Sequence, residues 1–146
     1  MRPYKQMRLT ASALALVAGG MIYILGRPRT LLLFWVADRI GLRRAFNTLR
    51  ATHPLEIWPE WAVYSLPGGL WSLSYLLLAD VLCSRLSTAM RVSLAGVIPF
   101  LGALSEVFQR FGWLPGTYDQ TDLLFYLTPY LIYLCIHLSY PTYKKT

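Results

Sequence analysis

Residues 9–25 read LTASALALVAGGMIYIL, a run of 17 residues that contains no charged side chain. A helix rises about 1.5 Å per residue, so the run forms a helix of about 25 Å, just long enough to cross the hydrocarbon core of a bilayer. The basic residues 1–8 precede it, as in a signal peptide, but Gly-Arg-Pro-Arg follows directly and no small-residue cleavage site is present. The run therefore predicts an uncleaved first transmembrane helix.

Three further apolar runs have a similar length, at residues 66–83, 92–111 and 121–140. Pro67 falls in the first turn of its run, where a missing N–H costs nothing, and Pro99 predicts a kink inside the next. The composition agrees, because only 14% of residues are charged, against about 25% in soluble domains. We expect one all-α membrane domain over residues 1–146, with four transmembrane helices.

The segment between the first two runs, residues 30–50, has a different pattern. Its opening apolar stretch ends at Asp38 and is too short to span a bilayer. Apolar side chains fall near one helical face and arginines near another, which is typical of a helix lying in the membrane interface. We expect one interfacial amphipathic helix at residues 30–50 and a loop at residues 51–61.

The net charge of +7 does not indicate nucleic-acid binding, because the basic residues lie between apolar runs. That placement favours contact with the lipid bilayer and its anionic lipids. Four crossings put both termini on one side, and each side then carries seven Lys and Arg residues. The basic residues before the first span break the tie and predict cytoplasmic termini.

Six of the seven acidic residues fall on the other side, here called the motif side. Glu106 and Gln109 lie one turn apart near the end of the third span, so they share a helix face. Asp119 and Asp122 begin the fourth span at the same level. Distant segments thus converge on one polar site.

The stretch SEVFQRFGWLPGTYDQTDLLFY, residues 105–126, resembles the motif of the VanZ-like family of small bacterial membrane proteins. In that motif a Glu and a Gln one turn apart end a membrane helix, and Asp-x-x-Asp opens the next. The matching residues here are Glu106, Gln109, Asp119 and Asp122. The stretch SLPGGLWSLSY, residues 65–75, is similar to a Pro-x-x-Leu-Trp helix start in some relatives.

Two positions depart from the motif. Many family members carry Arg shortly before the first Asp, where this chain has residues 115–117, and Asn where this chain has Tyr126. Some members are associated with resistance to glycopeptide antibiotics that act at the cell surface. The resemblance implies a fold, a bacterial cytoplasmic-membrane setting and a candidate site, but it implies no reaction.

The chemistry of the site stays open at this point. Asp119 and Asp122 fit a helix N-cap as well as a ligand site. Glu106 lies near a helix C-terminus, where the macrodipole disfavours an anion, so we expect it to pair with Arg110 at i+4. The predicted binding residues are Glu106, Gln109, Arg110, Asp119, Asp122 and Tyr126.

These residues favour binding of a lipid-linked or other envelope molecule, or of a membrane partner protein. The alternative is a lipid-modifying enzyme in which Glu106 is the acid or base and Asp119 and Asp122 hold a divalent cation. No cofactor is indicated. His53 could join Glu56 and Glu60 in a metal or acid–base set, but a solvated loop histidine is the simpler reading.

Other polar residues fit structural roles. The fourth span carries a stripe for which packing is favoured over a polar groove. Its members are Tyr126, Tyr130, Tyr133, His137 and Tyr140. His137 is too far along the helix to join the acidic site. Asp80 is expected to pair with Arg85 or Arg91, and Cys83 and Cys135 to be free thiols in the core.

Overall fold

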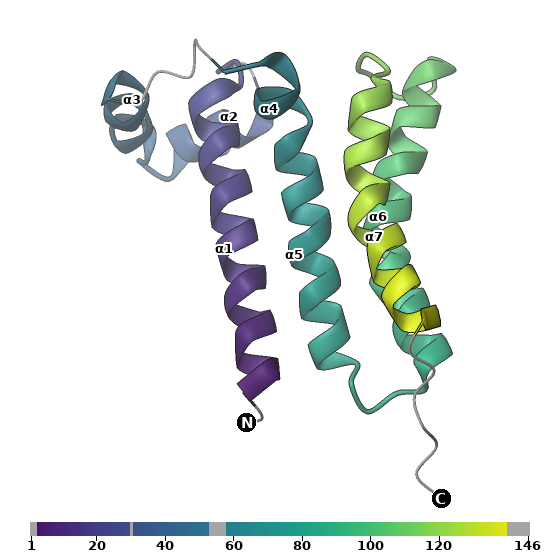
Figure 1. Cartoon of the computed structure of the whole chain (residues 1–146). Helices are drawn as coiled ribbons and strands as arrows, with labels where there is room; N and C mark the ends of the chain where they lie inside the picture. The colour runs from purple at the N-terminus through teal and green to yellow at the C-terminus, as the bar shows by residue number, and fades with distance from the viewer. Residues whose placement is uncertain (1–2, 30, 53–57, 140–146) are drawn as a thin grey trace, which may run out of the picture.

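The computed structural model of the chain describes residues 3–29, 31–52 and 58–139. These residues form seven helices and no strand, so the all-α prediction is confirmed (Figure 1). The helices are α1 (Pro3–Gly26), α2 (Leu32–Arg39), α3 (Arg43–Thr52), α4 (Glu60–Tyr64), α5 (Leu66–Leu82), α6 (Thr88–Arg110) and α7 (Gln120–Ser139).

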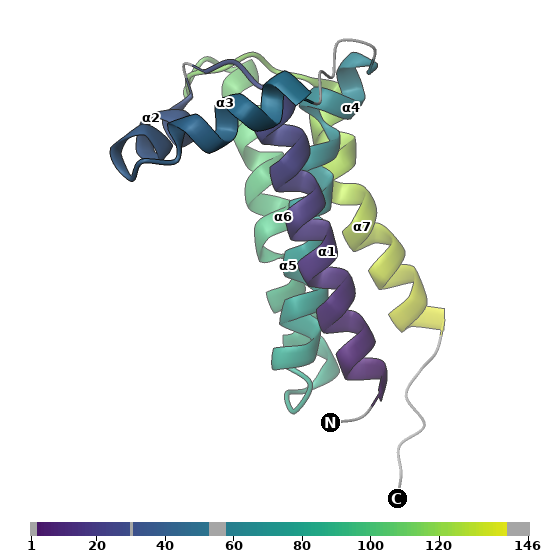
Figure 2. The same ribbon diagram turned by 90° about the vertical axis from the view of Figure 1, so that its left-hand side faces the viewer.

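Four long helices form an elongated bundle. α1 packs on α5, and α5 packs on both α6 and α7, which also pack on each other. The start of α1 and the end of α7 lie at the same end of this bundle, called the terminal end (Figure 1). The opposite end, called the motif end, carries α2, α3, α4 and the α6–α7 loop, with α3 crossing beside the last turns of α1 (Figures 1 and 2).

Two helices of the described chain, α1 and α6, are long and apolar enough to cross a membrane. α5 is also apolar but has 17 residues. By length and composition, these two helices could cross a membrane.

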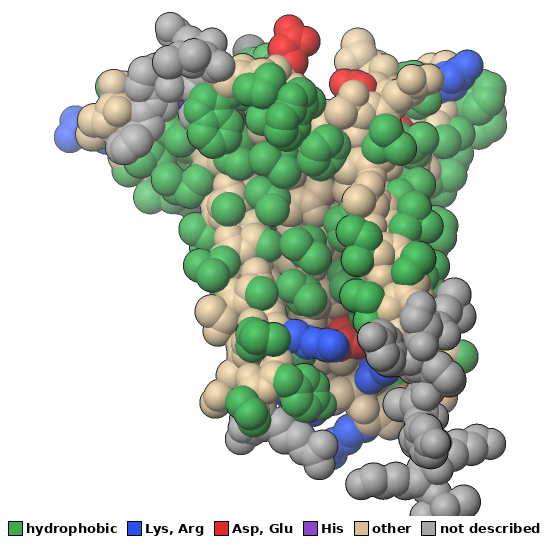
Figure 3. Space-filling view, in the orientation of Figure 1, with side chains coloured by type: hydrophobic (Ala, Val, Ile, Leu, Met, Phe, Trp, Pro, Cys, Tyr) green, Lys and Arg blue, Asp and Glu red, His purple; other side chains and the backbone are tan. Residues whose placement is uncertain are grey.

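The distribution of side chains is inverted relative to a soluble protein. Leu16, Phe100 and Ile132 are exposed on the long helices, whereas Ser72 and Asp80 are buried between them. Figure 3 shows hydrophobic side chains spread over the middle of the bundle, with charged side chains toward its ends. Soluble monomers rarely expose apolar surface so widely, so this bundle suits a lipid environment.

Glycines allow the helices to approach closely. A β-carbon at Gly102 would lie 2.5 Å from the ring of Tyr126, and one at Gly96 would lie 2.9 Å from Tyr130. Such small residues are typical of helix contacts inside membranes, where hydrophobic exclusion from water does not drive packing.

The single interfacial helix predicted at residues 30–50 is wrong, because α2 and α3 are separate helices. Gly41 adopts φ +80, and Leu42 N–H donates to Ala37 O at 2.8 Å, which ends α2 in a Schellman turn. The predicted loop at residues 51–61 is wrong at both ends. α3 continues to Thr52, and α4 begins at Glu60, an acid favoured in a first helical turn.

Candidate functional site

The carboxylate of Glu106 joins the end of α6 to the start of α7. Glu106 is only 4% exposed, and its Oε2 accepts a hydrogen bond from the backbone N–H of Asp119 at 3.2 Å. Asp119 in turn caps α7, since its Oδ1 accepts from the backbone N–H of Thr121 at 2.8 Å. The expected capping role of Asp119 is therefore seen, and Glu106 holds the capping residue in place.

The expected pairing of Glu106 with Arg110 is wrong. Arg110 is exposed, and its guanidinium lies over the ring of Tyr118, 5.2 Å from the ring centre. Glu106 makes no ion pair with any residue of the described chain. Glu106 faces α7 inside the bundle, whereas Arg110, at the last turn of α6, extends toward the outside.

Arg27, directly after the end of α1, is a cation near the site that was expected on the motif side but was not predicted as a site residue. Its charge acts on both Glu106 and Tyr126. Its Nη2 donates to Tyr64 O at 2.8 Å, and its guanidinium lies 4.7 Å from the centre of the Tyr64 ring. The signal was available, because Arg27 directly follows the first apolar run and must lie at the level of the motif residues.

Asp122 and Tyr126 lie in the first two turns of α7. The charge of Asp122 acts on Glu106 and Tyr126. Its Oδ1 is buried and accepts no hydrogen bond from the described residues. The Tyr126 ring fills the space beside Gly68 and Gly102, so it joins α5 and α6 beneath the acids. Asp122 thus keeps an unused acceptor inside the site.

Gln109 lies one turn beyond Glu106 but contacts the loop. The loop passes so close at Gly116, which has φ +135, that a β-carbon there would lie 2.8 Å from the Gln109 amide carbon. Gln109 thus supports the α6–α7 loop that carries Asp119.

The arrangement includes three carboxylates and one guanidinium, from α6, α7, the α6–α7 loop and the segment directly after α1. Two polar atoms in it are buried without a hydrogen-bond partner in the described chain, Asp122 Oδ1 and Arg27 Nε. Buried polar atoms nearly always have partners, so an acceptor and a donor left open together suit a polar ligand. No group of three or more His, Cys, Asp or Glu side chains in the described residues is placed to hold a metal ion. His53 and Glu56 lie outside these residues, and Glu60 is exposed on α4.

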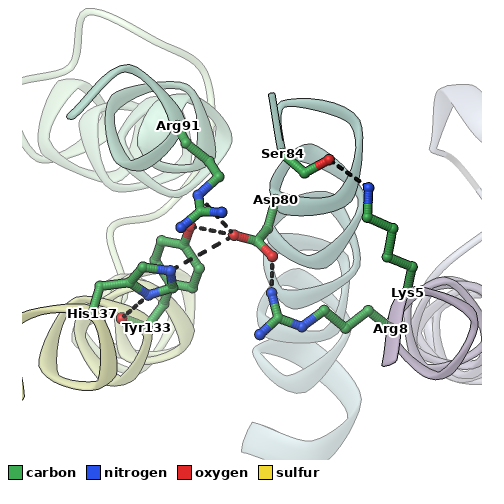
Figure 4. Close-up of polar contacts among 7 residues, drawn as sticks. All are labelled: Lys5, Arg8, Asp80, Ser84, Arg91, Tyr133 and His137. Carbon is green, nitrogen blue, oxygen red and sulfur yellow. Dashed lines mark hydrogen bonds and ion pairs between the residues drawn. The ribbon is translucent and has the colours of Figure 1, made fainter. Parts of the chain in front are cut away.

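A second polar cluster lies toward the terminal end, around Asp80 of α5 (Figure 4). Asp80 is 3% exposed and pairs with Arg8 of α1 and, at 3.4 Å, with Nε of Arg91 of α6. From α7, Tyr133 Oη donates to Asp80 Oδ1 at 2.7 Å, and His137 Nε2 lies 3.8 Å from the same oxygen. The expected pairing with Arg91 is confirmed, and all four long helices meet at one carboxylate.

The other residues of the predicted stripe on the fourth span and the two cysteines have structural positions. Tyr130 packs against Gly96 and donates to Val92 O at 3.2 Å. Tyr140 lies outside the described residues. Both cysteines are free, but Cys83 is half-buried and Cys135 is exposed, so the expected core position is wrong for Cys135. Cys135 lies on the outer face of α7. A small apolar thiol can face lipid tails there as readily as it can pack in a protein core.

Comparison of the chain with family models, with curated proteins and with solved structures finds no match. The resemblance to the VanZ-like family therefore stays a prediction from residues 105–126 and 65–75.

Proposed function

We propose that the chain is a four-span, VanZ-like protein of the bacterial cytoplasmic membrane that binds the polar part of a lipid-linked envelope molecule at its motif end. In this proposal both termini are cytoplasmic and the motif end faces outward. Of the predicted binding residues we retain Glu106, Asp119, Asp122 and Tyr126, and we add Arg27. Gln109 supports the α6–α7 loop, and Arg110 is exposed and lies over Tyr118.

Four crossings are supported by the bundle itself. α5 packs along both long apolar helices, and α7 packs on α5 and α6 while slanting away from α1 toward the terminal end (Figures 1 and 2). Both carry exposed apolar side chains, such as Leu78 on α5 and Leu131 on α7, and both contribute polar groups to the interior. A bundle in which only two of these helices entered the bilayer would leave the apolar faces of the others in water, which is unfavourable.

One observation carries the binding function. Glu106 is buried near the end of α6 with no cation paired to it, and the charges of Asp122 and Arg27 act on it. Asp122 has a buried acceptor without a partner in the described chain, and Arg27 has a buried donor without one. Ionisable groups at such depth are costly and usually functional. A bound polar group that completes these hydrogen bonds would offset that cost.

The ligand chemistry follows from the charges. Three carboxylates and one guanidinium leave an excess of acceptors, so the site favours hydroxyl or ammonium donors, with one acceptor for Arg27. Sugars and amino-acid groups carry both kinds of atom. Such groups lie at the membrane surface when they are attached to a lipid.

A lipid-modifying enzyme with Glu106 as acid or base is the alternative, and the burial of Glu106 is what favours it. The divalent cation of that alternative has less support, because Asp119 Oδ1 already caps α7. Non-catalytic binding therefore fits the geometry better.

Bound lipids can test the proposal. The protein would be purified in mild detergent, incubated with a total lipid extract of the host membrane, and examined by native mass spectrometry. We expect a lipid carrying a hydroxyl- or amine-rich head group to bind the wild type and to be lost from Asp122→Asn. The matched control is Asp38→Asn, which removes an exposed acid on α2.

Equal lipid retention in the wild type and Asp122→Asn would overturn the proposal. Loss of a cross-linked membrane protein from Asp122→Asn, with lipids unchanged, would favour a partner protein as the occupant. Release of a chemically altered lipid by the wild type alone would favour the enzyme.

A further inference from the structure

A cavity of about 530 Å³ lies at the motif end, apart from the Glu106 site. None of the proposed binding residues lines it. Its walls come from the end of α1 and Arg29 after it, from α3, and from α4 with Trp58, two residues before α4. The described residues that line it are Leu25, Gly26, Arg29, Asn47, Arg50, Ala51, Trp58, Glu60, Val63 and Tyr64.

Arg50 is fixed at the edge of this cavity. Its Nη1 donates to Ile24 O at 3.0 Å and to Arg27 O at 2.8 Å, which satisfies carbonyl groups at the C-terminal end of α1. Its guanidinium also lies 5.4 Å from the centre of the Phe34 ring. The cation is thus held in place before any ligand arrives.

Arg29 brings a second positive charge to the same cavity. Burial lowers the pKa of Arg50, and the charge of Arg29 lowers it further, so the two guanidinium groups repel each other. Arg29 has no hydrogen bond or ion pair within the described chain. Glu60 is the single acid among the described lining residues, so they carry one positive charge in excess. A fixed Arg50 and an Arg29 without an ion-pair partner in the described chain, both lining one cavity, suit an anion.

An apolar groove of about 620 Å³ is lined by residues of α1, α2 and α5. Leu33 and Val36 of α2 line the groove, whereas Phe34 and Asp38 line a smaller hollow of about 150 Å³ that shares Arg29 with the cavity. Different side chains of α2 therefore line a polar hollow, which adjoins the cavity through Arg29, and the apolar groove. The groove is also lined by Leu16, Gly20, Tyr23, Ile24 and Trp71.

The last turns of α1 connect the two compartments. Ile24 lines the groove, its carbonyl oxygen binds Arg50, and the next residue, Leu25, lines the cavity. A molecule with an anionic head and an apolar tail could therefore use both. Arginine provides a planar fork that matches phosphate oxygens, and Trp58 and Tyr64 are residue types enriched at the interface where lipid phosphates lie.

We propose that this cavity binds the phosphate of an anionic phospholipid, with Arg29 and Arg50 on the phosphate, Asn47 as a further donor and an acyl chain in the groove. The single excess positive charge of the described lining residues matches the single negative charge of a phosphodiester. The two sites share no lining residue, although Arg27 contacts both Arg50 and Tyr64 of the cavity.

The test compares lipid binding by single-charge variants. The full chain, delipidated in a neutral detergent, would be titrated with phosphatidylglycerol and, separately, with phosphatidylcholine, and the complexes counted by native mass spectrometry. Arg29→Gln should weaken phosphatidylglycerol binding about tenfold, as expected for the loss of one charge-assisted hydrogen bond. Arg29 has no partner in the described chain, so folding should be unaffected.

Arg44→Gln is the matched control. Arg44 also belongs to the basic segment at α3 but does not line the cavity. Its removal lowers the net charge equally and should leave phosphatidylglycerol binding unchanged. If Arg29→Gln and Arg44→Gln weakened phosphatidylglycerol binding equally, the effect would come from the overall surface charge and the proposal would be overturned. It would also be overturned if the wild type bound phosphatidylcholine as tightly as phosphatidylglycerol.

Inorganic phosphate distinguishes a lipid from a free anion. Millimolar phosphate should compete poorly with phosphatidylglycerol, because it gains nothing from the groove. Val36→Asp, which places a charge in the groove, should weaken phosphatidylglycerol binding. Strong competition by phosphate together with unchanged lipid binding in Val36→Asp would mean that the cavity takes free phosphate and would overturn the assignment to a lipid.

Discussion

The phenolic oxygen of Tyr133 lies 2.7 Å from Oδ1 of Asp80 and joins α7 to α5 in the bundle interior. Arg8 adds α1 to the same carboxylate, and Arg91 adds α6. Asp80 is the single acidic residue among the described residues of the terminal end, so it is the counter-ion of both arginines. The group of two arginines and one aspartate carries one positive charge in excess. The four long helices are therefore aligned by one side chain.

Asp80→Asn should destabilise the bundle. The change leaves two partly buried arginines, 35% and 20% exposed, without their counter-ion. Breaking a buried pair in this way costs about 3 kcal/mol. We expect a lower unfolding temperature in detergent, followed by circular dichroism, and a lower level in membranes.

Asp38→Asn is the control for this prediction, because the Asp38–Arg43 pair is 3.8 Å long and exposed on both sides. Exposed pairs contribute roughly 0–1 kcal/mol, so its unfolding temperature should stay close to that of the wild type. If the two variants unfolded alike, Asp80 would not be the residue that aligns the helices.

Gly102→Ala should disrupt the contact between α6 and α7. The added β-carbon would lie 2.5 Å from the Tyr126 ring, at the ring's attached end, where the side chain cannot simply swing away. Overpacking of this kind typically costs about 1–3 kcal/mol. The comparison is Gly20→Ala on α1, where nothing lies within 4 Å of a β-carbon. Thermal unfolding should show a loss for the first variant only, and equal losses would contradict the packing described for Tyr126.

The long elements of the fold could be predicted from the sequence, since apolar runs of spanning length leave few alternatives. All four predicted spans overlap α1, α5, α6 and α7. The break at Gly41 was readable as well, because a glycine after a short amphipathic run is a common helix end. α4 was harder, since five residues after a proline give no periodicity.

The sequence predicted the height of the candidate site along the bundle, but it did not predict which side chains contact each other there. Helix geometry places Glu106 and Asp119 at one height, and the structure joins them directly. Sequence spacing also suggested Arg110 as a partner, yet side-chain direction decided against it. Arg8 could not be assigned to Asp80 because the two are 72 residues apart and meet only through tertiary packing.

The segment from α2 to α3 should stay on one side of the membrane. α2 has eight residues, about 12 Å of helix, which cannot cross a bilayer. Single cysteines replacing Arg39 and Arg44, introduced into a variant lacking Cys83 and Cys135, should react with an impermeant maleimide added to the same side. Labelling from opposite faces would mean an extra crossing and would exchange the sides of every later loop.

Both termini should lie in the cytoplasm. The start of α1 carries Lys5 and Arg8 within its first two turns, and the start of the first helix usually dominates orientation. Alkaline phosphatase fused after Lys145 should be inactive, because it folds only outside the cytoplasm, and a fluorescent protein at the same position should be bright. The reverse pattern would turn the motif end toward the cytoplasm.

Glu106→Gln should separate the charge of the site from its fold. The amide oxygen can still accept the backbone N–H of Asp119, which Glu106 now accepts at 3.2 Å, so the α6–α7 loop should remain in place. The amount of protein in the membrane and its unfolding temperature should therefore match those of the wild type. Binding of the lipid-linked ligand should be lost, because the acceptor side of the site loses a buried negative charge. Native mass spectrometry with the same lipid extract measures this loss.

Glu106→Leu is the comparison, since it keeps the bulk but removes the acceptor. The N–H of Asp119 would be left unsatisfied at a cost of about 1–3 kcal/mol, so this variant should unfold earlier. Arg110→Gln should change neither the unfolding temperature nor the amount of protein in the membrane. Arg110 lies over Tyr118 and makes no ion pair with Glu106 in the described chain. If Glu106→Gln lowered the protein level and Arg110→Gln restored it, the two would form an ion pair in the membrane. If Glu106→Gln left lipid binding intact, the carboxylate would serve only to hold the loop.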